Sequence, residues 1–224
     1  MSKVIAMIPA RMGSQRLRQK NLRELNGVPL ISRAIAKCLK TDCFDEVWVN
    51  SENAVFGDIA ADMGVGFHQR PEKLGDNQAT SEQYIEEFLR NHECDLLVQV
   101  HSIAPLLGTG EVRSFVEAFR ESECDVMLSC ILDQIEVAYQ DVPVNFTLAE
   151  KTNSQDLQPV QRITWSITGW TRSTYLAACD EGKCATYSGQ VGYFPVSAIS
   201  GHVIKTQQDL DIAAALLDIV GDEN

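Results

Sequence analysis

The sequence predicts an α/β fold of three layers (α/β/α), in which a mostly parallel sheet lies between two layers of helices. Three observations support this fold class. Strand-like and helix-like segments alternate four times within the first 130 residues. The strand-like segments are short apolar runs, which are typical of parallel strands buried on both faces. The length of 224 residues fits a single domain, residues 1–224, with enough chain to bury a large core.

Five apolar runs have the length of buried strands, and polar or turn-forming residues bound them. These runs are Lys3–Ile8, Glu46–Asn50, Val65–His68, Asp95–Val100 and Asp125–Cys130. The run Asp95–Val100 is the clearest of them, so we expect it to lie near the centre of the sheet.

Segments with apolar residues at helical spacing follow these strands. Helices are expected over Val28–Leu39, Ala54–Met63, Glu111–Phe119 and Gln207–Val220, the last capped by Thr206. A further helix, capped by Ser81, is expected to run through Tyr84, Ile85 and Phe88. Ser and Thr are favoured caps because their side-chain oxygens accept hydrogen bonds from the first turn. The last four residues, 221–224, are expected to fray.

The regular alternation ends at residue 132. Residues 132–165 mix Pro, Asn, Gln and β-branched residues without a helical pattern. We therefore expect a β-rich inserted arm there, which would pack on a second subunit. Ile163–Tyr175 then predicts a strand followed by a short helix, and Gly192–Pro195 predicts a last short strand.

The charge and the cysteines argue against several classes of function. A net charge of −12 repels a phosphate backbone and an anionic membrane, which disfavours nucleic acid and lipid as partners. The seven cysteines form no Cys-x-x-Cys pair, so we expect reduced thiols in the cytoplasm instead of a zinc site. The apolar run Val4–Ala10 has strand length, and no apolar run approaches the ~18 residues of a membrane-spanning helix.

A basic loop directly after the first strand carries the strongest functional signal. In an open parallel sheet, ligands bind beyond the carboxyl ends of the strands. Gly13 would let the backbone approach a ligand closely, and N–H groups there can hold phosphate oxygens. Four basic side chains are candidates to surround a triphosphate: Arg11, Arg16, Arg18 and Lys20.

The alternative interpretation of this loop is a solvated basic segment without a ligand. Five basic residues within 13 positions, counting Arg23, favour a bound anion because the chain as a whole is acidic. The loop has neither the Walker A spacing nor Gly-x-Gly-x-x-Gly. A P-loop NTPase and a dinucleotide-dependent dehydrogenase are therefore disfavoured.

The loop resembles that of the acylneuraminate (CMP-sialic acid) cytidylyltransferases, within the wider nucleotide-sugar cytidylyltransferases that include the Kdo-type enzymes. That family carries a loop of the form IPARxGSxRLxxKN, and ten residues of Ile8–Asn21 match it. Arg70–Asp76 resembles the family's RPxxL segment and the acid after it, with Ala79 and Thr80 in register. Leu97–Leu107 resembles LLQPTSPLR with one extra residue. The resemblance covers nearly the whole chain in order and spacing.

This resemblance implies a Rossmann-like nucleotidyltransferase fold and an enzyme. Such an enzyme transfers CMP from CTP to the anomeric hydroxyl of a 2-keto-3-deoxy sugar acid and releases pyrophosphate. The family's members are usually homodimers joined through the inserted arm. The expected partners are thus CTP, a sugar acid and a second copy of the chain.

The resemblance also implies roles for individual residues. The nucleotide would be bound by Ala10, Arg11, Gly13, Ser14, Arg16, Lys20, Asn21, Arg70 and Ala79. The sugar acid would face Gln99, with His101 and Ser102 close by. Catalysis of this reaction consists mostly of positioning and charge stabilisation, which points to Arg11, Lys20 and Lys205 as the catalytic side chains.

His101 is a position at which the family does not normally have His. A His at a strand end is more often a hydrogen-bonded structural residue than a catalyst. The alternative role is a base for the sugar hydroxyl, because imidazole ordinarily titrates close to neutral pH. Asp76 is expected to accept hydrogen bonds within its own loop.

A segment near the C-terminus departs from the family. The family reads DIDTxxDL there, and its first two aspartates bind the catalytic Mg²⁺. Val203 and Lys205 stand in those two positions here, and the acid that Kdo-type enzymes place after the central strand is missing from His101–Pro105. Mg²⁺ is still expected with the triphosphate, but no carboxylate stands at the expected ligand positions.

Three interpretations follow. In the first, the enzyme works, with Mg²⁺ held by the triphosphate and water or with Lys205 supplying positive charge. In the second, the protein is catalytically degenerate and binds a nucleotide or nucleotide-sugar without reacting it. In the third, the fold serves a different nucleotidyl transfer. The first is favoured because the loop retains almost every phosphate contact of the family.

Overall fold

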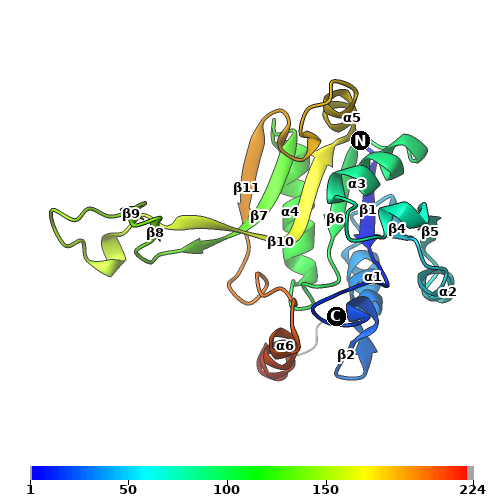
Figure 1. Ribbon diagram of the computed structural model, residues 1–224, viewed down its shortest axis with the longest axis horizontal. Coiled ribbons are helices and arrows are strands. Elements are labelled where there is room, and N and C mark those ends of the chain that lie inside the picture. Colours follow the sequence, from blue (N-terminus) through cyan, green and yellow to red (C-terminus); the bar gives the residue numbers. More distant parts are fainter. Residues whose placement is uncertain (1, 221–224) are drawn as a thin grey trace.

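The computed structural model describes residues 2–220, so the expectation for residues 221–224 lies outside it. Its main sheet contains, from one edge to the other, β11 (Val191–Pro195), β7 (Val126–Asp133), β10 (Val160–Thr171), β6 (Leu96–Val100), β1 (Val4–Pro9), β4 (Glu46–Ser51) and β5 (Gly66–Gln69) (Figure 1). Neighbouring strands are parallel except at β10, which runs antiparallel to both β6 and β7. The mostly parallel sheet predicted from the sequence is confirmed.

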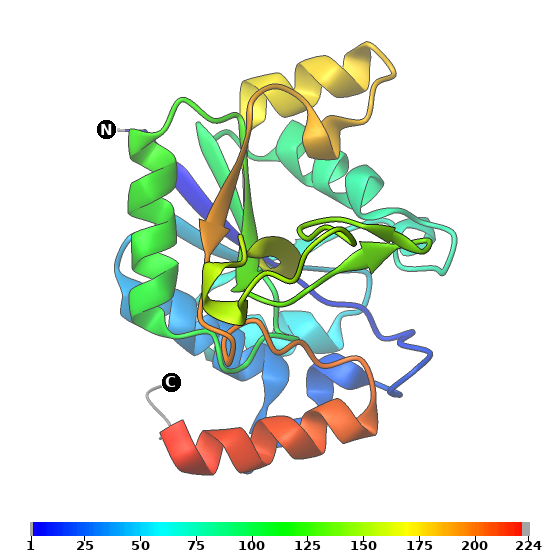
Figure 2. The ribbon, with the colours of Figure 1, turned by 90° about the vertical axis from the view of Figure 1, so that its left-hand side faces the viewer.

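Helices cover both faces of this sheet, as a three-layer fold requires. One face packs against α1 (Leu30–Thr41), α2 (Val55–Asp62) and α4 (Thr109–Glu121), and the other against α3 (Ser81–Asn91) and α5 (Arg172–Asp180). Figure 2 shows α4 on one side of the sheet and α3 and α5 on the other. The last helix, α6 (Gln207–Val220), crosses one end of the sheet.

The alternation of side chains along β1 explains why both faces need helices. Val4, Ala6 and Ile8 pack with α1, α2 and α4, whereas Ile5 and Met7 pack with α3 and α5. All five side chains are fully buried. A strand that is apolar on both faces is thus stable only between two helical layers.

The predicted helix caps are partly confirmed. The N-cap of α3 is Thr80 instead of Ser81, because the Thr80 hydroxyl accepts a hydrogen bond from the Gln83 amide at 3.3 Å. The Gln83 side chain accepts one in return from the Thr80 amide at 2.9 Å, which completes a capping box. Thr206 caps α6 as predicted, since its hydroxyl accepts from the Asp209 amide at 3.3 Å.

The basic loop after β1 leads into a short ribbon. The 3₁₀ helix η1 (Lys20–Leu22) is followed by β2 (Glu24–Leu25) and β3 (Val28–Pro29), which pair antiparallel. Asn26 and Gly27 form the turn between them, with φ of 50° and 76°. Asn-Gly is favoured in such turns because both residues tolerate positive φ. The helix predicted from Val28 therefore begins two residues later, as α1.

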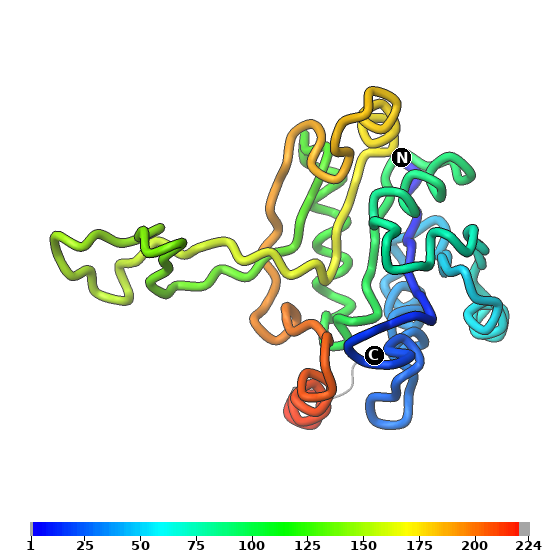
Figure 3. The backbone as a smooth tube through the Cα atoms, viewed as in Figure 1, coloured from blue at the N-terminus to red at the C-terminus, as the bar shows by residue number. Residues whose placement is uncertain are grey.

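The helix α6 packs against this ribbon and the basic loop. Leu17 from the loop and Leu25 from β2 share a buried cluster with Ile204, Leu210 and Leu217. Figure 3 shows the loop and α6 together at the end of the sheet where β1 finishes. Residues 17–25 and the segment around α6, which are far apart in the sequence, therefore meet at the carboxyl edge of the parallel strands. Within the described residues, no helix combines the length and apolarity that crossing a membrane requires.

A long hairpin projects from the sheet between β7 and β10 (Figure 3). The projecting part comprises residues 134–159 and contains β8 (Ala138–Tyr139), β9 (Val142–Pro143) and the 3₁₀ helix η3 (Ser154–Asp156). The predicted segment 132–165 also includes the end of β7 and the start of β10, because these strands continue to pair as far as Asp133 and Val160.

Gly169 provides a test of the packing between β10 and α4. It lies in β10 between Val98 and Met127, and a Cβ there would lie 2.6 Å from the ring of Phe119 and 3.3 Å from that of Phe115. Both rings are buried in the core. We predict that Gly169→Ala lowers the free energy of unfolding by roughly 1–3 kcal/mol, measured by urea denaturation, because the core becomes overpacked.

Gly110→Ala is the matched control. Gly110 lies in the first turn of α4, and a Cβ there would meet no atom within 4 Å. This substitution should leave stability unchanged or raise it by up to ~1 kcal/mol, because Ala restricts the unfolded chain. Equal losses in the two variants would contradict the packing argument.

Candidate functional site

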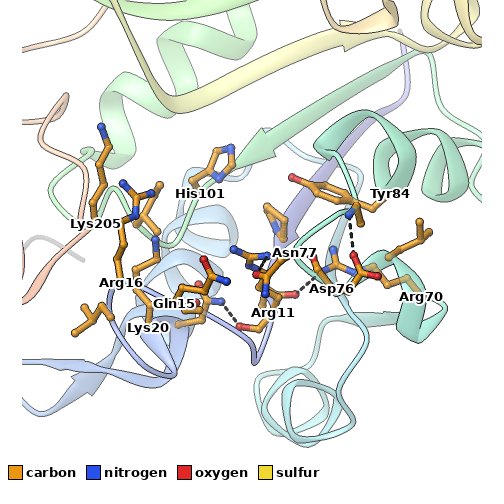
Figure 4. A pocket seen from close by; sticks show the side chains of 18 residues that line it. Arg11, Gln15, Arg16, Lys20, Arg70, Asp76, Asn77, Tyr84, His101 and Lys205 are labelled. Atoms are coloured by element: carbon orange, nitrogen blue, oxygen red, sulfur yellow. Dashed lines mark hydrogen bonds between the residues drawn. The ribbon is translucent and has the colours of Figure 1, made fainter.

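A cavity of about 420 Å³ opens at the carboxyl edge of β1 and β6, beside the basic loop. Residues from four parts of the chain line it, within 9–21, 70–84 and 101–103 and at Lys205. Figure 4 shows their side chains converging from different elements. The cavity lies where the rule for open parallel sheets places a ligand.

Most of the residues predicted for the site meet in this cavity. The predicted residues that line it are Ala10, Arg11, Ser14, Arg16, Lys20, Asn21, Arg70, Ala79, His101 and Lys205. Gln99 and Ser102 are buried behind the lining residues. Gly13 is exposed beside the cavity, and a Cβ there would meet the Gly75 carbonyl oxygen at 4.0 Å. The fold itself therefore leaves room for a side chain at Gly13.

Hydrogen bonds hold the basic loop in a closed shape. The Asn21 side-chain amide donates to the Arg11 carbonyl at 3.0 Å, and the Ser102 hydroxyl donates to Asn21 Oδ1 at 2.7 Å. On the other side, the Met12 amide donates to Glu52 Oε1 at 2.8 Å. Asn21 and Ser102 are both buried, so this polar pair fixes the loop against the end of β6.

Three cationic side chains of the cavity lie close enough to Lys20 to disfavour its positive charge. Burial, and then the positive charges of Arg16, Arg11 and Lys205, lowers the pKa of Lys20 to about 8. Lys20 Nζ also donates to the Ile204 carbonyl at 3.2 Å. Figure 4 shows Lys205, Arg16 and Lys20 gathered on one side of the cavity. A bound polyanion would relieve this repulsion.

The other basic side chains of the loop take no part in the cavity. Arg18 is exposed and is not a lining residue. Arg23 donates to Gln207 Oε1 at 3.0 Å, which ties the loop to α6. Of the five basic residues between positions 11 and 23, Arg11, Arg16 and Lys20 therefore face the cavity, and Lys205 joins them from the other end of the sequence.

Arg70 forms the opposite side of the cavity together with Tyr84 (Figure 4). Its side chain is 2% exposed, and its guanidinium carbon lies 4.7 Å from the centre of the Tyr84 ring. Nη2 donates to the Ala10 carbonyl at 3.0 Å and to Glu52 Oε2 at 3.1 Å. Arg70 is thus a buried, paired cation that joins the start of the basic loop to the end of β4.

His101 is held from behind by Gln99. Gln99 Nε2 lies 2.6 Å from His101 Nε2 and donates to the Tyr84 hydroxyl at 3.3 Å. Burial, and then the positive charge of Lys20, lowers the pKa of His101 to about 4. The imidazole is therefore neutral at neutral pH and is a much weaker base than an ordinary imidazole.

The loop that contains Asp76 forms the wall between Arg11 and Arg70. Asp76 Oδ1 accepts hydrogen bonds from the amides of Gln78 at 2.7 Å and Ala79 at 2.8 Å, which is the loop-stabilising role predicted for it. Arg11 Nη1 donates to the Asp76 carbonyl at 3.2 Å and to Asn77 Oδ1 at 3.3 Å. Arg11 therefore links the basic loop to the opposite wall.

The cavity does not fit a divalent cation held by protein carboxylates. Asp76 is the acidic residue among its described lining residues, and its Oδ1 is occupied by backbone amides. Glu52 lies behind the wall and pairs with Arg70 at 3.1 Å. No His, Cys, Asp or Glu side chains within residues 2–220 form a group of three that could hold a metal. A hard cation needs several oxygen ligands, which these residues do not offer.

Three residues of the site, Glu52, Tyr84 and Asn77, were not predicted from the sequence. Glu52 directly follows β4, and the rule that ligands bind at the carboxyl edge of a parallel sheet could have flagged it. Tyr84 lies in the first turns of α3, directly after the loop that matched the family's RPxxL segment. Nothing in the sequence pattern marks Asn77.

Curated proteins with related sequences share cytidylyltransferase names. The chain is 27% identical over 203 residues to an N-acylneuraminate cytidylyltransferase of Streptococcus agalactiae serotype V, covering 84% of this chain and 48% of that protein. It is 27% identical over 121 residues to a 3-deoxy-manno-octulosonate cytidylyltransferase of Christiangramia forsetii, covering 54% of this chain and 47% of that protein. The chain thus spans about half the length of these curated relatives.

A solved structure of a CMP:2-keto-3-deoxy-manno-octonic acid synthetase complexed with CTP resembles the whole fold. The TM-score is 0.73 at 18% identity, over 98% of this chain and 100% of that chain. At this identity the likeness shows the fold, and it confirms the predicted Rossmann-like nucleotidyltransferase architecture. The family model described as cytidylyltransferase matches residues 5–211. On this match, which includes the basic loop and every element that lines the cavity, the chain belongs to the cytidylyltransferase family.

Proposed function

We propose that this protein transfers CMP from CTP to the anomeric hydroxyl of a sialic-acid-like 2-keto-3-deoxy sugar acid. The observation that carries the proposal is the convergence of Arg11, Arg16, Lys20 and Lys205 on one cavity at the carboxyl edge of the sheet. Clustered cations suit a triphosphate, because each can donate charge-assisted hydrogen bonds to phosphate oxygens. Membership of the cytidylyltransferase family supports CTP as the nucleotide, and the relatives named for acylneuraminate and octulosonate support a sugar acid.

The two sides of the cavity give CTP an orientation. The triphosphate would lie against Lys205, Arg16 and Lys20, and the base and ribose would lie toward Arg70 (Figure 4). Ala79, which also lines the cavity, would contact the base or ribose. The Ser14 amide donates to the Met12 carbonyl at 3.0 Å, so the Ser14 hydroxyl, which lines the cavity, is the group that would meet the phosphates. This orientation gives these residues the roles that the resemblance implies, and those roles stay predictions.

The transfer is a displacement at phosphorus. The anomeric oxygen attacks the α-phosphorus, the bond from that phosphorus to the oxygen bridging to the β-phosphate breaks, and pyrophosphate departs with the electron pair. In this proposal the hydroxyl proton passes to solvent, because burial, and then the charge of Lys20, lowers the pKa of His101 to about 4 before the triphosphate binds. Arg11 and Lys20 would hold the phosphates and stabilise the charge that grows on the departing pyrophosphate.

The sugar acid would lie beside His101, which lines the cavity between its cationic side and Tyr84 (Figure 4). A neutral imidazole can exchange hydrogen bonds with sugar hydroxyls without the cost of burying another charge. Gln99 and Ser102 would act from behind, by holding His101 and Asn21 in place.

We also propose that a second copy of the chain packs on the projecting hairpin, residues 134–159, in the cytoplasm. The hairpin exposes large apolar side chains: Ile135 58%, Tyr139 69%, Val142 64%, Val144 58% and Leu148 82%. So much apolar surface on one projecting segment is typical of a protein interface. The seven cysteines are free thiols, which suits a reducing compartment.

CTP binding can be measured through the melting temperature. At about 100 times its dissociation constant, CTP should stabilise the fold by about 2.7 kcal/mol, which raises Tm by roughly 5–10 °C. ATP and GTP should raise it less. Arg16→Ala should reduce the shift because a phosphate contact is lost, whereas Arg18→Ala is the control, since Arg18 lies outside the cavity. Identical melting temperatures with and without each nucleotide would refute nucleotide binding.

The low pKa of Lys20 makes CTP binding dependent on pH. The lysine loses its proton as the pH rises through about 8, and a bound triphosphate favours the protonated form. CTP affinity should therefore fall above about pH 8, and binding there should take up a proton. Calorimetry in buffers of different ionisation enthalpy measures both effects. In Lys20→Arg, which stays charged, the decline should vanish; the same decline in that variant would assign it to another group.

Turnover separates the enzyme from the nucleotide-binding alternative. Pyrophosphate release is measured with CTP and a panel of nonulosonic acids that includes acylneuraminate and octulosonate. The proposal predicts release with at least one acid that depends on both substrates. CTP binding without release for any acid would instead favour the catalytically degenerate binding protein.

A further inference from the structure

The backbone on both sides of Lys205 is fixed, so the fold sets the position of its side chain. The amide of Ile204 donates to the Ile103 carbonyl at 2.8 Å, and Ile204 is fully buried. The amides of Lys205 and Thr206 donate to Asp209 Oδ2 at 2.9 Å and 2.8 Å. These bonds hold the segment across the carboxyl end of β6, where the side chain of Lys205 lines the cavity.

A second lysine is attached to the same segment. Lys20 Nζ donates to the Ile204 carbonyl at 3.2 Å, so lysines from opposite ends of the sequence lie side by side. Arg16 lies on the same side of the cavity (Figure 4). Folding this chain therefore places three positive charges together, next to the carboxyl ends of β1 and β6.

Asp76 is the one acidic residue among the described lining residues, and Asp209, outside that lining, only partly offsets the positive charges around Lys20. Oδ1 of Asp76 accepts from two amides of its own loop, and Glu52 is paired with the buried Arg70. A divalent cation placed beside Lys20 and Lys205 would meet repulsion without ligands to offset it. The family that the sequence resembles carries two aspartates in this segment, at the positions of Val203 and Lys205.

We propose that Lys205, together with Lys20, neutralises the triphosphate in place of a divalent cation held by protein carboxylates. The inference rests on the proposed function and makes Lys205 a catalytic residue of the transfer. Its ammonium group donates hydrogen bonds to oxygens of the β- and γ-phosphates. When the bond to the α-phosphorus breaks, the departing pyrophosphate gains negative charge, and Lys205 stabilises it.

The experiment compares CTP binding by calorimetry in EDTA for the wild type, Lys205→Met and Lys205→Arg. The wild type should bind CTP in EDTA, and added Mg²⁺ should not be required. Lys205→Met keeps the length of the side chain without its charge, so its affinity should fall roughly tenfold or more. Lys205→Arg keeps the charge and should stay within about threefold of the wild type.

Lys183→Met is the matched control. Its ammonium pairs with Glu181 at 2.6 Å and does not line the cavity, so removing this charge should leave CTP affinity unchanged. The pH dependence of CTP affinity is a second measurement, and it should stay unchanged in Lys205→Met if the role of Lys205 is only structural. Without the Lys205 charge, Lys20 keeps its proton to higher pH, so the decline of CTP affinity should move to higher pH in Lys205→Met.

The outcomes separate this proposal from the function on which it rests. A wild type that binds no CTP with or without Mg²⁺ refutes the proposed function itself. A wild type that binds CTP only after Mg²⁺ is added overturns the role of Lys205 and keeps the function. If Lys205→Met binds CTP with wild-type affinity and its pH profile is unshifted, the role of Lys205 is likewise overturned, and the proposed function stands. Turnover that persists in EDTA and falls in Lys205→Met supports the proposal.

Discussion

Repulsion between like charges is the constraint on which the site depends. Lys20 lies beside Arg16, Arg11 and Lys205, and burial first, then these three positive charges, lower its pKa to about 8. The rest of the fold must hold these groups together against that repulsion. The cluster that Leu17 forms with the chain around α6 provides apolar burial directly beneath them. An anion in the cavity would turn the repulsion into attraction.

The parallel sheet determines where these charges meet. Because β1, β4 and β6 run in the same direction, the loops that follow them share one edge. The basic loop follows β1, Glu52 follows β4 and His101 follows β6. The segment around Ile204 reaches the same edge through its bond to Ile103. Residues far apart in the sequence therefore form one cavity, and the pair of Asn21 and Ser102 keeps its wall closed.

Local patterns in the sequence were enough to predict the sheet, most helices and the basic loop. Apolar runs mark strands buried on both faces, and the motif that begins at Ile8 marks the loop. The antiparallel strand β10 and the extent of the hairpin depend on pairing between distant residues, which no local pattern encodes. The Asn-Gly pair at residues 26 and 27 is typical of a hairpin turn, but the segment was interpreted as part of the basic loop, so strands β2 and β3 were not predicted. Glu52 and Tyr84 contribute to the site through their contacts with Arg70, which pairs with Glu52 and lies over the Tyr84 ring. These contacts join residues that are distant in the sequence, so no local pattern indicates them.

If the cations of the cavity bind a polyphosphate, the protonation of Lys20 must respond to CTP. The ¹³Cε resonance of Lys20 can be titrated by NMR without and with saturating CTP. We expect a midpoint of about 8 without nucleotide and a clear upward shift when CTP is bound. A midpoint near the ordinary lysine value of 10.5 without nucleotide, or one that CTP leaves unchanged, would contradict this expectation.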